Sequence, residues 1–310
     1  MSQTTNAILM IRPVKFRMNE QTAVNNYFQE DLKLKNAEIN TKAQLEFDDF
    51  VEKLRAVGVN VIVENDDELL DTPDSIFPNN WVSFHENGDV GLYPMFAKNR
   101  RRERRDEVFI RLEKEGFQIN NIIDYTSAEE EGFFLEGTGS LLLDRINSKA
   151  YCALSARADE ELFIEFCEDF EYTPVLFTAN QNVEGKRLPI YHTNVMMCLG
   201  ELFSVICLDS IDDKKERKDV IKNLKQDGKT IIEISESQMH QFAGNMLQVK
   251  GKNDERYLVM SKAAHDSLTT KQVTDINKFC PILSSSLETI ETCGGGSARC
   301  MMAEVFLPKV

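Results

Sequence analysis

The sequence has few features that would bind a metal, a nucleotide or a nucleic acid. Its four histidines form no HxxxH pair and its seven cysteines form no CxxC pair, which are common spacings of zinc ligands. No GxGxxG motif follows an expected strand and opens a helix, so dinucleotide binding has no support. The one basic run, residues 100–105, is short and is followed by acidic residues. We therefore expect no metal, no cofactor and no nucleic-acid partner.

Long apolar runs are also missing. No stretch approaches the roughly 18 apolar residues of a membrane span, and residues 1–6 lack the basic and apolar regions of a signal peptide. The net charge of -15 disfavours anionic membranes. The cysteines are odd in number and several lie in apolar runs, which is typical of reduced thiols. These features predict a cytoplasmic protein without a membrane partner and leave a homodimer open.

The 310 residues contain 42% apolar side chains, enough to bury a sizeable core. Five similar units follow one another, each with a strand ending in small or polar residues, a second strand, a helix and a third strand. The unit openings recur at Phe77, Leu135, Tyr191 and Phe242, which are 58, 56 and 51 residues apart. Cys300 lies a further 58 residues along and begins the next predicted strand. The expected elements include strand 8–13, helix 43–54, strand 59–63, strand 90–95, helix 104–114, strand 117–123, strand 149–155, helix 159–169, strand 173–177, strand 202–207, helix 214–226, strand 230–234, strand 257–260 and helix 270–279.

The two ends of the chain are expected to complete each other. The first unit lacks an obvious second strand, and the last strand has no helix of its own. We expect the C-terminal strand to complete the unit that the N-terminus begins, because a closed ring leaves no open edge. This predicts a single α/β domain over residues 1–310, made of five ββαβ-type units around a central pocket. The alternative is two α/β domains joined near residue 180, where residues 179–182 resemble a linker.

A ring would bring the polar ends of the opening strands to its centre, namely Asn80, Glu136, His192, Asn245 and Cys300. Cys300 is our candidate nucleophile, because three glycines precede it and glycine lets the main chain approach a ligand closely. We expect residues 301–306 to form the strand that anchors it. The alternative is a tight turn and a bystander thiol.

His192 and Glu136 would complete a nucleophilic set. A thiol titrates near ~8.5 and needs a cationic neighbour or hydrogen-bond donors to ionise near neutrality. His192 could protonate the leaving group and then activate water, and Glu136 could orient His192 or bind a cationic part of the substrate. Each has a structural alternative, a core histidine in one case and a turn before Gly137 in the other. A narrow central pocket suits a small molecule better than the peptide of a thiol protease.

Four segments, in order along the chain, resemble the guanidine-modifying penteins, which include arginine deiminases, dimethylarginine dimethylaminohydrolases and amidinotransferases. The resemblance covers essentially the whole chain. Its first segment, residues 73–81, is most similar to the branch that contains citrulline-utilisation hydrolases. It implies a five-bladed α/β propeller and a covalent S-carbamoyl or thiouronium intermediate on Cys300. It also implies His192 as general acid and base, and Glu136 as the partner of substrate and histidine. The segments are residues 73–81, 135–139, 192–194 and 294–300.

The resemblance also implies how an amino-acid substrate is held. Asp74 matches a family aspartate near the amino-acid end of the substrate. Arg157 matches an arginine that grips the α-carboxylate, and the arginine fork suits a carboxylate. Arg101 is a looser match for a second clamp.

Asn80 and Asn194 depart from the family pattern. Deiminases have aspartate at the position of Asn80, and arginine deiminases also have aspartate at the position of Asn194. Losing a charge-assisted pair to a guanidinium costs on the order of a few kcal/mol. An asparagine can instead donate to a carbonyl oxygen and accept from an NH2 group, which fits the ureido group of citrulline. We therefore expect hydrolysis of citrulline to ornithine, ammonia and carbon dioxide.

Several alternatives stay open at this point. A succinylarginine-hydrolysing relative also has asparagines at these positions, so hydrolysis of the arginine deiminase or dimethylargininase type remains one of them. An amidinotransferase would use an amine in place of water. A pentein acting only as a binding module is a third alternative, against which the retained Cys300, His192 and Glu136 argue.

Overall fold

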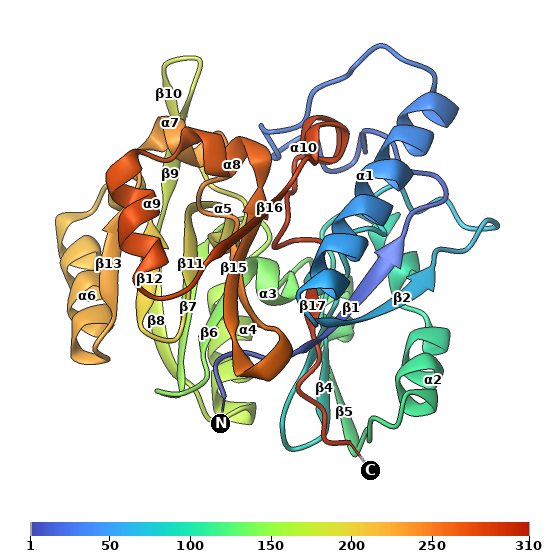
Figure 1. Cartoon of the computed structure of the whole chain (residues 1–310), viewed down its shortest axis with the longest axis horizontal. Helices are drawn as coiled ribbons and strands as arrows, with labels where there is room; N and C mark the ends of the chain where they lie inside the picture. Colours follow the sequence, from blue (N-terminus) through green and yellow to red (C-terminus); the bar gives the residue numbers. More distant parts are fainter. Residues whose placement is uncertain (1, 310) are drawn as a thin grey trace.

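The computed structural model describes residues 2–309, and its frame consists of small sheets and the helices that cover them (Figure 1). In four three-stranded sheets the first strand pairs antiparallel with the second, and the second pairs parallel with the third. These strands are β3 (Val82–Phe84), β4 (Asp89–Leu92) and β5 (Asn121–Asp124); β6 (Leu141–Asp144), β7 (Lys149–Leu154) and β8 (Thr173–Thr178); β11 (Met197–Leu199), β12 (Phe203–Ile206) and β13 (Thr230–Glu233); and β14 (Leu247–Lys250), β15 (Arg256–Ser261) and β16 (Ile282–Ser285).

A fifth three-stranded sheet joins the two ends of the chain. β1 (Ala7–Arg12) pairs parallel with β2 (Asn60–Asn65) and antiparallel with β17 (Ala303–Glu304). The predicted completion of the first unit by the C-terminal strand is therefore confirmed. Within residues 2–309, no strand pairing joins these sheets into one continuous barrel.

Helices connect the parallel strands of each sheet, as parallel pairing requires a crossover. α1 is amphipathic and turns Ile39, Ala43, Phe47, Phe50 and Leu54 into the core, which confirms the helix predicted around residues 43–54. The predicted helices in the other four units are confirmed as well, with shifts of a few residues at their ends. The crossover helices are α1 (Asn36–Ala56), α2 (Asp106–Lys114), α4 (Glu160–Asp169), α6 (Lys214–Gln226), α8 (Lys262–Ser267) and α9 (Thr270–Asn277).

The opening strands are shorter than predicted, because short helical turns precede three of them. These turns are η1 (Pro78–Asn80), α3 (Gly137–Ser140) and α5 (Thr193–Met196). The terminal strand predicted for residues 301–306 is also wrong in its start, since Cys300 lies in a turn and β17 covers two residues. Residues 179–182, the proposed linker of the alternative fold, instead enter a hairpin of β9 (Asn180–Val183) and β10 (Lys186–Pro189).

Other elements were not predicted from the sequence. β16, the third strand of its sheet, carries partly buried side chains with no run of β-branched residues to mark it. The further helical elements are η2 (Arg100–Glu103), η3 (Thr126–Glu130), η4 (Leu208–Ser210), α7 (Glu236–Met239), η5 (Lys252–Asp254) and α10 (Glu288–Gly294). Within residues 2–309, no helix combines the length and apolar character needed to cross a bilayer.

Candidate active site

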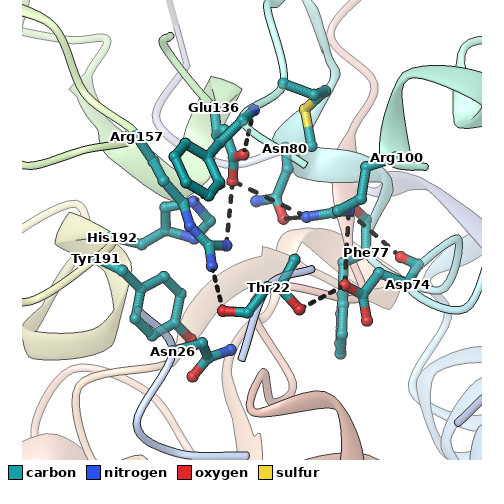
Figure 2. A network of polar contacts seen from close by, with 12 residues as sticks. Thr22, Asn26, Asp74, Phe77, Asn80, Arg100, Glu136, Arg157, Tyr191 and His192 are labelled. Atoms are coloured by element: carbon teal, nitrogen blue, oxygen red, sulfur yellow. Dashed lines mark hydrogen bonds and ion pairs between the residues drawn. The ribbon is translucent and has the colours of Figure 1, made fainter. Parts of the chain in front are cut away.

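The predicted site residues converge from distant parts of the chain. Asp74, Asn80, Arg157, His192 and Cys300 all line one cavity of about 10 Å³. Figure 2 labels Asp74, Asn80, Arg157 and His192, together with Glu136, in one network of polar contacts. The two remaining predicted residues lie one contact away, Glu136 on His192 and Asn194 on Cys300.

Glu136 and His192 form a buried pair at the starts of two short helical turns. Glu136 is the N-cap of α3 and His192 is the N-cap of α5. The Nε2–H of His192 donates to Oε2 of Glu136 at 2.7 Å, and the backbone N–H of Phe96 donates to Oε1 at 3.0 Å. Because a carboxylate only accepts, this bond leaves Nδ1 of a neutral His192 with its lone pair.

Charges around this pair set its protonation. Burial opposes the charge of Glu136, but Arg157, the bond from His192 and Arg100 outweigh it and lower the pKa of Glu136 to about 2. Burial lowers the pKa of His192 to about 4, although Glu136 opposes this shift. At neutral pH the pair is therefore a carboxylate and a neutral imidazole.

Close packing around residue 139 accounts for a glycine at this position after Glu136. A Cβ at this position would lie 2.4 Å from Nδ2 of Asn80 and 2.8 Å from Nδ1 of His192. Only glycine allows the α3 turn to approach both side chains so closely. The motif around Glu136 is thus required for packing at the site, and is more than a turn closure.

Cys300 lies in the turn that follows α10. Its Sγ accepts from Nδ2 of Asn245 at 3.2 Å and from Nδ2 of Asn194 at 3.6 Å. Burial raises the pKa of the Cys300 thiol, while the backbone near Ser297 and these amides oppose the rise. The resting group is therefore a thiol, with two amide donors in place for a thiolate.

The glycine-rich turn is held from both sides. Gly295 has a left-handed backbone with φ of 62° and ends α10. Its carbonyl accepts from the Tyr191 hydroxyl. On the other side, the hydroxyl of Ser297 donates to Oε1 of Glu291 at 2.6 Å. These contacts fix the main chain that leads to Cys300.

Asp74 and Arg157, which were predicted to hold the amino-acid end of a substrate, both line the same cavity. Oδ2 of Asp74 accepts from Asn19 at 2.7 Å, whereas its buried Oδ1 has no partner among residues 2–309. Burial raises the pKa of Asp74, and Arg100 opposes this most strongly. Arg157 donates to Oε2 of Glu136 at 3.5 Å, and its guanidinium stacks 4.9 Å from the ring centre of Tyr191.

Arg100 is a site residue that the sequence reasoning missed. It is 2% exposed, and its Nη1–H donates to Oδ1 of Asn80 at 2.8 Å. Arg101, the looser match to a second clamp, instead donates to the carbonyl of Met95 and pairs with Glu129 at 3.2 Å, away from the cavity lining. No sequence signal distinguishes Arg100 from its neighbours in the run 100–105.

The segment before α1 covers the site. Arg157 donates to the backbone carbonyl of Thr22 at 3.0 Å and, through Nε, to Oδ1 of Asn25 at 3.0 Å. The side chain of Asn26 donates to the carbonyl of Gly294 at 3.3 Å. A cavity of about 10 Å³ holds roughly one water molecule, so this conformation is closed to an amino acid. A larger cavity of about 680 Å³ lies beside the same segment, but it is lined by none of the predicted site residues.

The arrangement brings a thiol, a histidine–carboxylate pair, an aspartate and an arginine together in one place. Asn245, which the sequence analysis grouped at the centre, also belongs to it. Within residues 2–309, no group of three or more histidine, cysteine, aspartate or glutamate side chains is arranged to hold a metal ion.

A family model described as "N,N dimethylarginine dimethylhydrolase, eukaryotic" matches residues 12–307. No curated protein matches the chain.

Solved structures with the same fold include ArgZ, an arginine dihydrolase of the ornithine–ammonia cycle in Cyanobacteria. It is 16% identical with a TM-score of 0.74, and the match covers 98% of this chain and 41% of that one. This chain thus spans about two fifths of ArgZ. The N-terminal domain of ArgZ bound to substrate gives a TM-score of 0.70 at 16% identity, over 97% of this chain and 99% of that one. A dimethylarginine dimethylaminohydrolase adduct with S-methyl-L-thiocitrulline gives 0.60 at 13% identity, over 96% and 98%. These likenesses support the fold.

Proposed function

This chain belongs to the family described as eukaryotic N,N-dimethylarginine dimethylhydrolases, and we propose that, within that family, it hydrolyses citrulline to ornithine, ammonia and carbon dioxide. The chain is a member of the pentein superfamily and a hydrolase of carbon–nitrogen bonds. The finer assignment, a ureido in place of a guanidino substrate, is our proposal. We further propose that residues 1–310 form one catalytic domain, a five-bladed α/β propeller, and that the enzyme acts in the cytoplasm.

The orientation of the Asn80 amide carries the proposal. Arginine has no acceptor, so Oδ1 of Asn80 must face Nη1 of Arg100, 2.8 Å away. The amide nitrogen then lies on the side of His192, as Figure 2 shows. From the sequence we expected Asn80 both to donate and to accept, but its Oδ1 already accepts from Arg100. A donor alone suits the carbonyl oxygen of a ureido group and opposes the N–H groups of a guanidinium.

The charges of the site favour the same choice. Glu136 already has two cationic neighbours, Arg157 at 3.5 Å and Arg100 at 4.0 Å. Both of its oxygens accept hydrogen bonds from the protein. A guanidinium would add a third cation beside this carboxylate, whereas a neutral ureido group adds none.

The proposed reaction begins on Cys300. Its thiol proton passes to Nδ1 of His192, and Sγ forms a bond to the ureido carbon while Asn245 and Asn194 stabilise the sulfur. The bond from that carbon to the side-chain nitrogen breaks, and this nitrogen takes the proton and leaves as ornithine. Water, deprotonated by His192, then attacks the S-carbamoyl carbon and releases the thiol. The carbamic acid formed decomposes to ammonia and carbon dioxide.

The amino-acid end of the substrate has two partners in this proposal. The unpaired Oδ1 of Asp74 would accept from the α-ammonium group. Arg157 would bind the α-carboxylate in place of the Thr22 carbonyl and the Asn25 amide oxygen, which occupy its donors in the closed conformation.

The deciding experiment is incubation of the pure protein with citrulline and with arginine separately, with ornithine, citrulline and ammonia measured. Ornithine from citrulline, with arginine turned over at least about tenfold more slowly, supports the proposal. Rapid conversion of arginine to citrulline would indicate a deiminase, and its conversion to ornithine with two ammonia would indicate an arginine dihydrolase, the activity given for ArgZ. Turnover that requires an added amine would indicate an amidinotransferase. Asn80→Asp should lower citrulline turnover and improve arginine binding; unchanged selectivity would count against the role of Asn80.

A further inference from the structure

Arg100 is held almost entirely by the protein. Its Nε–H and one Nη2–H donate to the two carboxylate oxygens of Glu103, at 3.0 and 2.9 Å. Nη2 also donates to the carbonyl of Phe77 at 3.1 Å, and Nη1 to Asn80 at 2.8 Å. Of five N–H donors, four have partners within one short stretch of the chain. One Nη1–H is left, and Arg100 also lines the small cavity beside Asn80.

We propose that Arg100, held in place by Glu103, is a positioning residue that determines substrate specificity by fixing which end of the Asn80 amide faces the substrate. This inference rests on the proposed function, because it assigns the cause of the ureido preference. In this role Arg100 acts on the reacting end of the substrate through Asn80.

The two ends of an asparagine amide have nearly the same shape and opposite hydrogen-bonding character. An amide free to rotate could offer Nδ2 to a carbonyl oxygen or Oδ1 to an N–H group, and so would accept either substrate class. Asn80 also donates from Nδ2 to Oδ1 of Asn79 at 3.1 Å, and the buried Nδ2 of Asn79 has no partner among residues 2–309. Asn79 could satisfy either orientation by rotating its own amide. The cation of Arg100 is the partner that permits only one.

Glu103 supplies the rigidity. It is 3% exposed, and its carboxylate binds the guanidinium through two parallel contacts from one turn of η2. A two-point contact fixes the plane of the guanidinium as well as its position. Nη1 is therefore aimed at Asn80 by the geometry of the pair, which a single-point cation could not reproduce.

The test is the ratio of kcat/KM for citrulline to kcat/KM for arginine in Arg100→Lys. Lysine keeps the charge but cannot contact Asn80 and Glu103 in the same fixed geometry. The ratio should therefore fall by about tenfold, which is the effect expected when one hydrogen-bonding group faces the substrate in the wrong orientation. In an Asn80→Ala background, Arg100→Lys should leave the ratio unchanged, because the amide through which it acts is gone. Arg101→Lys is the matched control, and should keep the wild-type ratio in both backgrounds.

The outcomes separate this inference from the proposed function. If the wild-type protein does not prefer citrulline, the proposed function itself fails. If it does, and folded Arg100→Lys loses rate equally with both substrates, Arg100 has only a structural role and the inference is overturned. A fall of the ratio that persists in the Asn80→Ala background would also overturn it, since the effect would not pass through the amide.

Should Arg100→Lys fail to fold, Glu103→Gln takes its place. Glutamine is the same shape but accepts through one oxygen only, so Arg100 loses one of its two fixing contacts. The ratio should then fall by about threefold, again only when Asn80 is present. A ratio equal to that of the wild type in a folded Glu103→Gln protein would contradict the inference.

Discussion

Two buried arginines flank Glu136, and their partners differ in kind. Arg157 and Arg100 are both 2% exposed, and both lie within 4.0 Å of the same carboxylate oxygen. The other hydrogen-bond acceptors of Arg157 come from Thr22 and Asn25, in the segment that covers the site. Those of Arg100 come from residues 74–103, including its neighbour three residues along. One set is carried by the covering segment, whereas the other belongs to the frame.

This difference shows how the same side chain can serve two purposes a few ångströms apart. An arginine whose partners are carried by a separate segment can exchange them for a ligand. An arginine whose partners are local and charged holds other groups in place. The predictions below test whether Arg157 binds and Arg100 organises.

The largest effect is expected from Cys300→Ser, which should reduce turnover by about 10⁴-fold or more, since it removes the nucleophile. The fold should be intact, with a melting temperature close to that of the wild type. Citrulline binding by this inactive protein, measured by calorimetry, then allows the two arginines to be compared by affinity alone. Cys293→Ser, in the same terminal segment, is the control and should keep its activity; equal losses in both variants would contradict the assignment of Cys300.

Arg100→Ala should destabilise the protein by about 3–5 kcal/mol, because it leaves Glu103 buried without its cationic partner. Urea unfolding measures this change. Arg101→Ala, which removes a cation with a more exposed side chain from the same turn, should cost about 1 kcal/mol or less. Comparable losses from the two variants would show that Arg100 is not part of the frame.

Arg157→Ala in the Cys300→Ser background should weaken citrulline binding by about 10- to 100-fold, because charge-assisted bonds to the α-carboxylate are lost. Binding of N-butylurea, which has the ureido group without the carboxylate, should be unaffected by the same substitution. A similar loss for both ligands would mean that Arg157 supports the pocket and does not grip the carboxylate.

The pH dependence of kcat/KM should also distinguish Arg157 from Arg100. Burial and both arginines lower the pKa of His192 to about 4, so kcat/KM should fall only as the pH drops through about 4, where Nδ1 becomes protonated. Arg157→Met removes one cation and should move this acid limb upward, towards the ordinary value of 6.5. Arg100→Lys keeps its charge and should leave the limb in place. A wild-type limb near 6.5 would be inconsistent with the buried, neutral imidazole.

The smallest effect is expected from Asn25→Ala. Oδ1 of Asn25 occupies Arg157 in the closed conformation and competes with a substrate carboxylate. Its removal should lower KM for citrulline by about two- to fivefold, in line with one hydrogen bond. Asn26→Ala, which removes a bond to Gly294 instead, should not lower KM.

Much of the frame could be predicted from the sequence, because the strands and amphipathic helices recur with a regular spacing. The pairing of the last strand with β1 followed from counting the incomplete units at each end. The candidate residues Cys300, His192 and Glu136 could be found because glycines or a strand opening accompany each of them.

Other parts of the site have no such signal. Arg100 is one of five arginines in a six-residue run, and only the fold decides which of them is buried. The covering segment around Thr22 and Asn25 has no helical or strand periodicity, and its contacts with Arg157 span more than a hundred residues of sequence. A strand was predicted directly after Cys300 because the residues that follow it are apolar. In the structure Met301 and Met302 are buried in the core but do not pair with another strand.

The pairing of β1 with β17 has a consequence for how the enzyme is made. Ile8 lies opposite Glu304, so nearly the whole length of the described chain separates the two partners. Bringing them together closes a very long loop, which is a slow kind of contact to form. The Cys300 sulfur, four residues before that strand partner, is therefore expected to reach its amide donors late in assembly. Partly folded molecules should accordingly contain the other site residues in place long before they can attack a substrate.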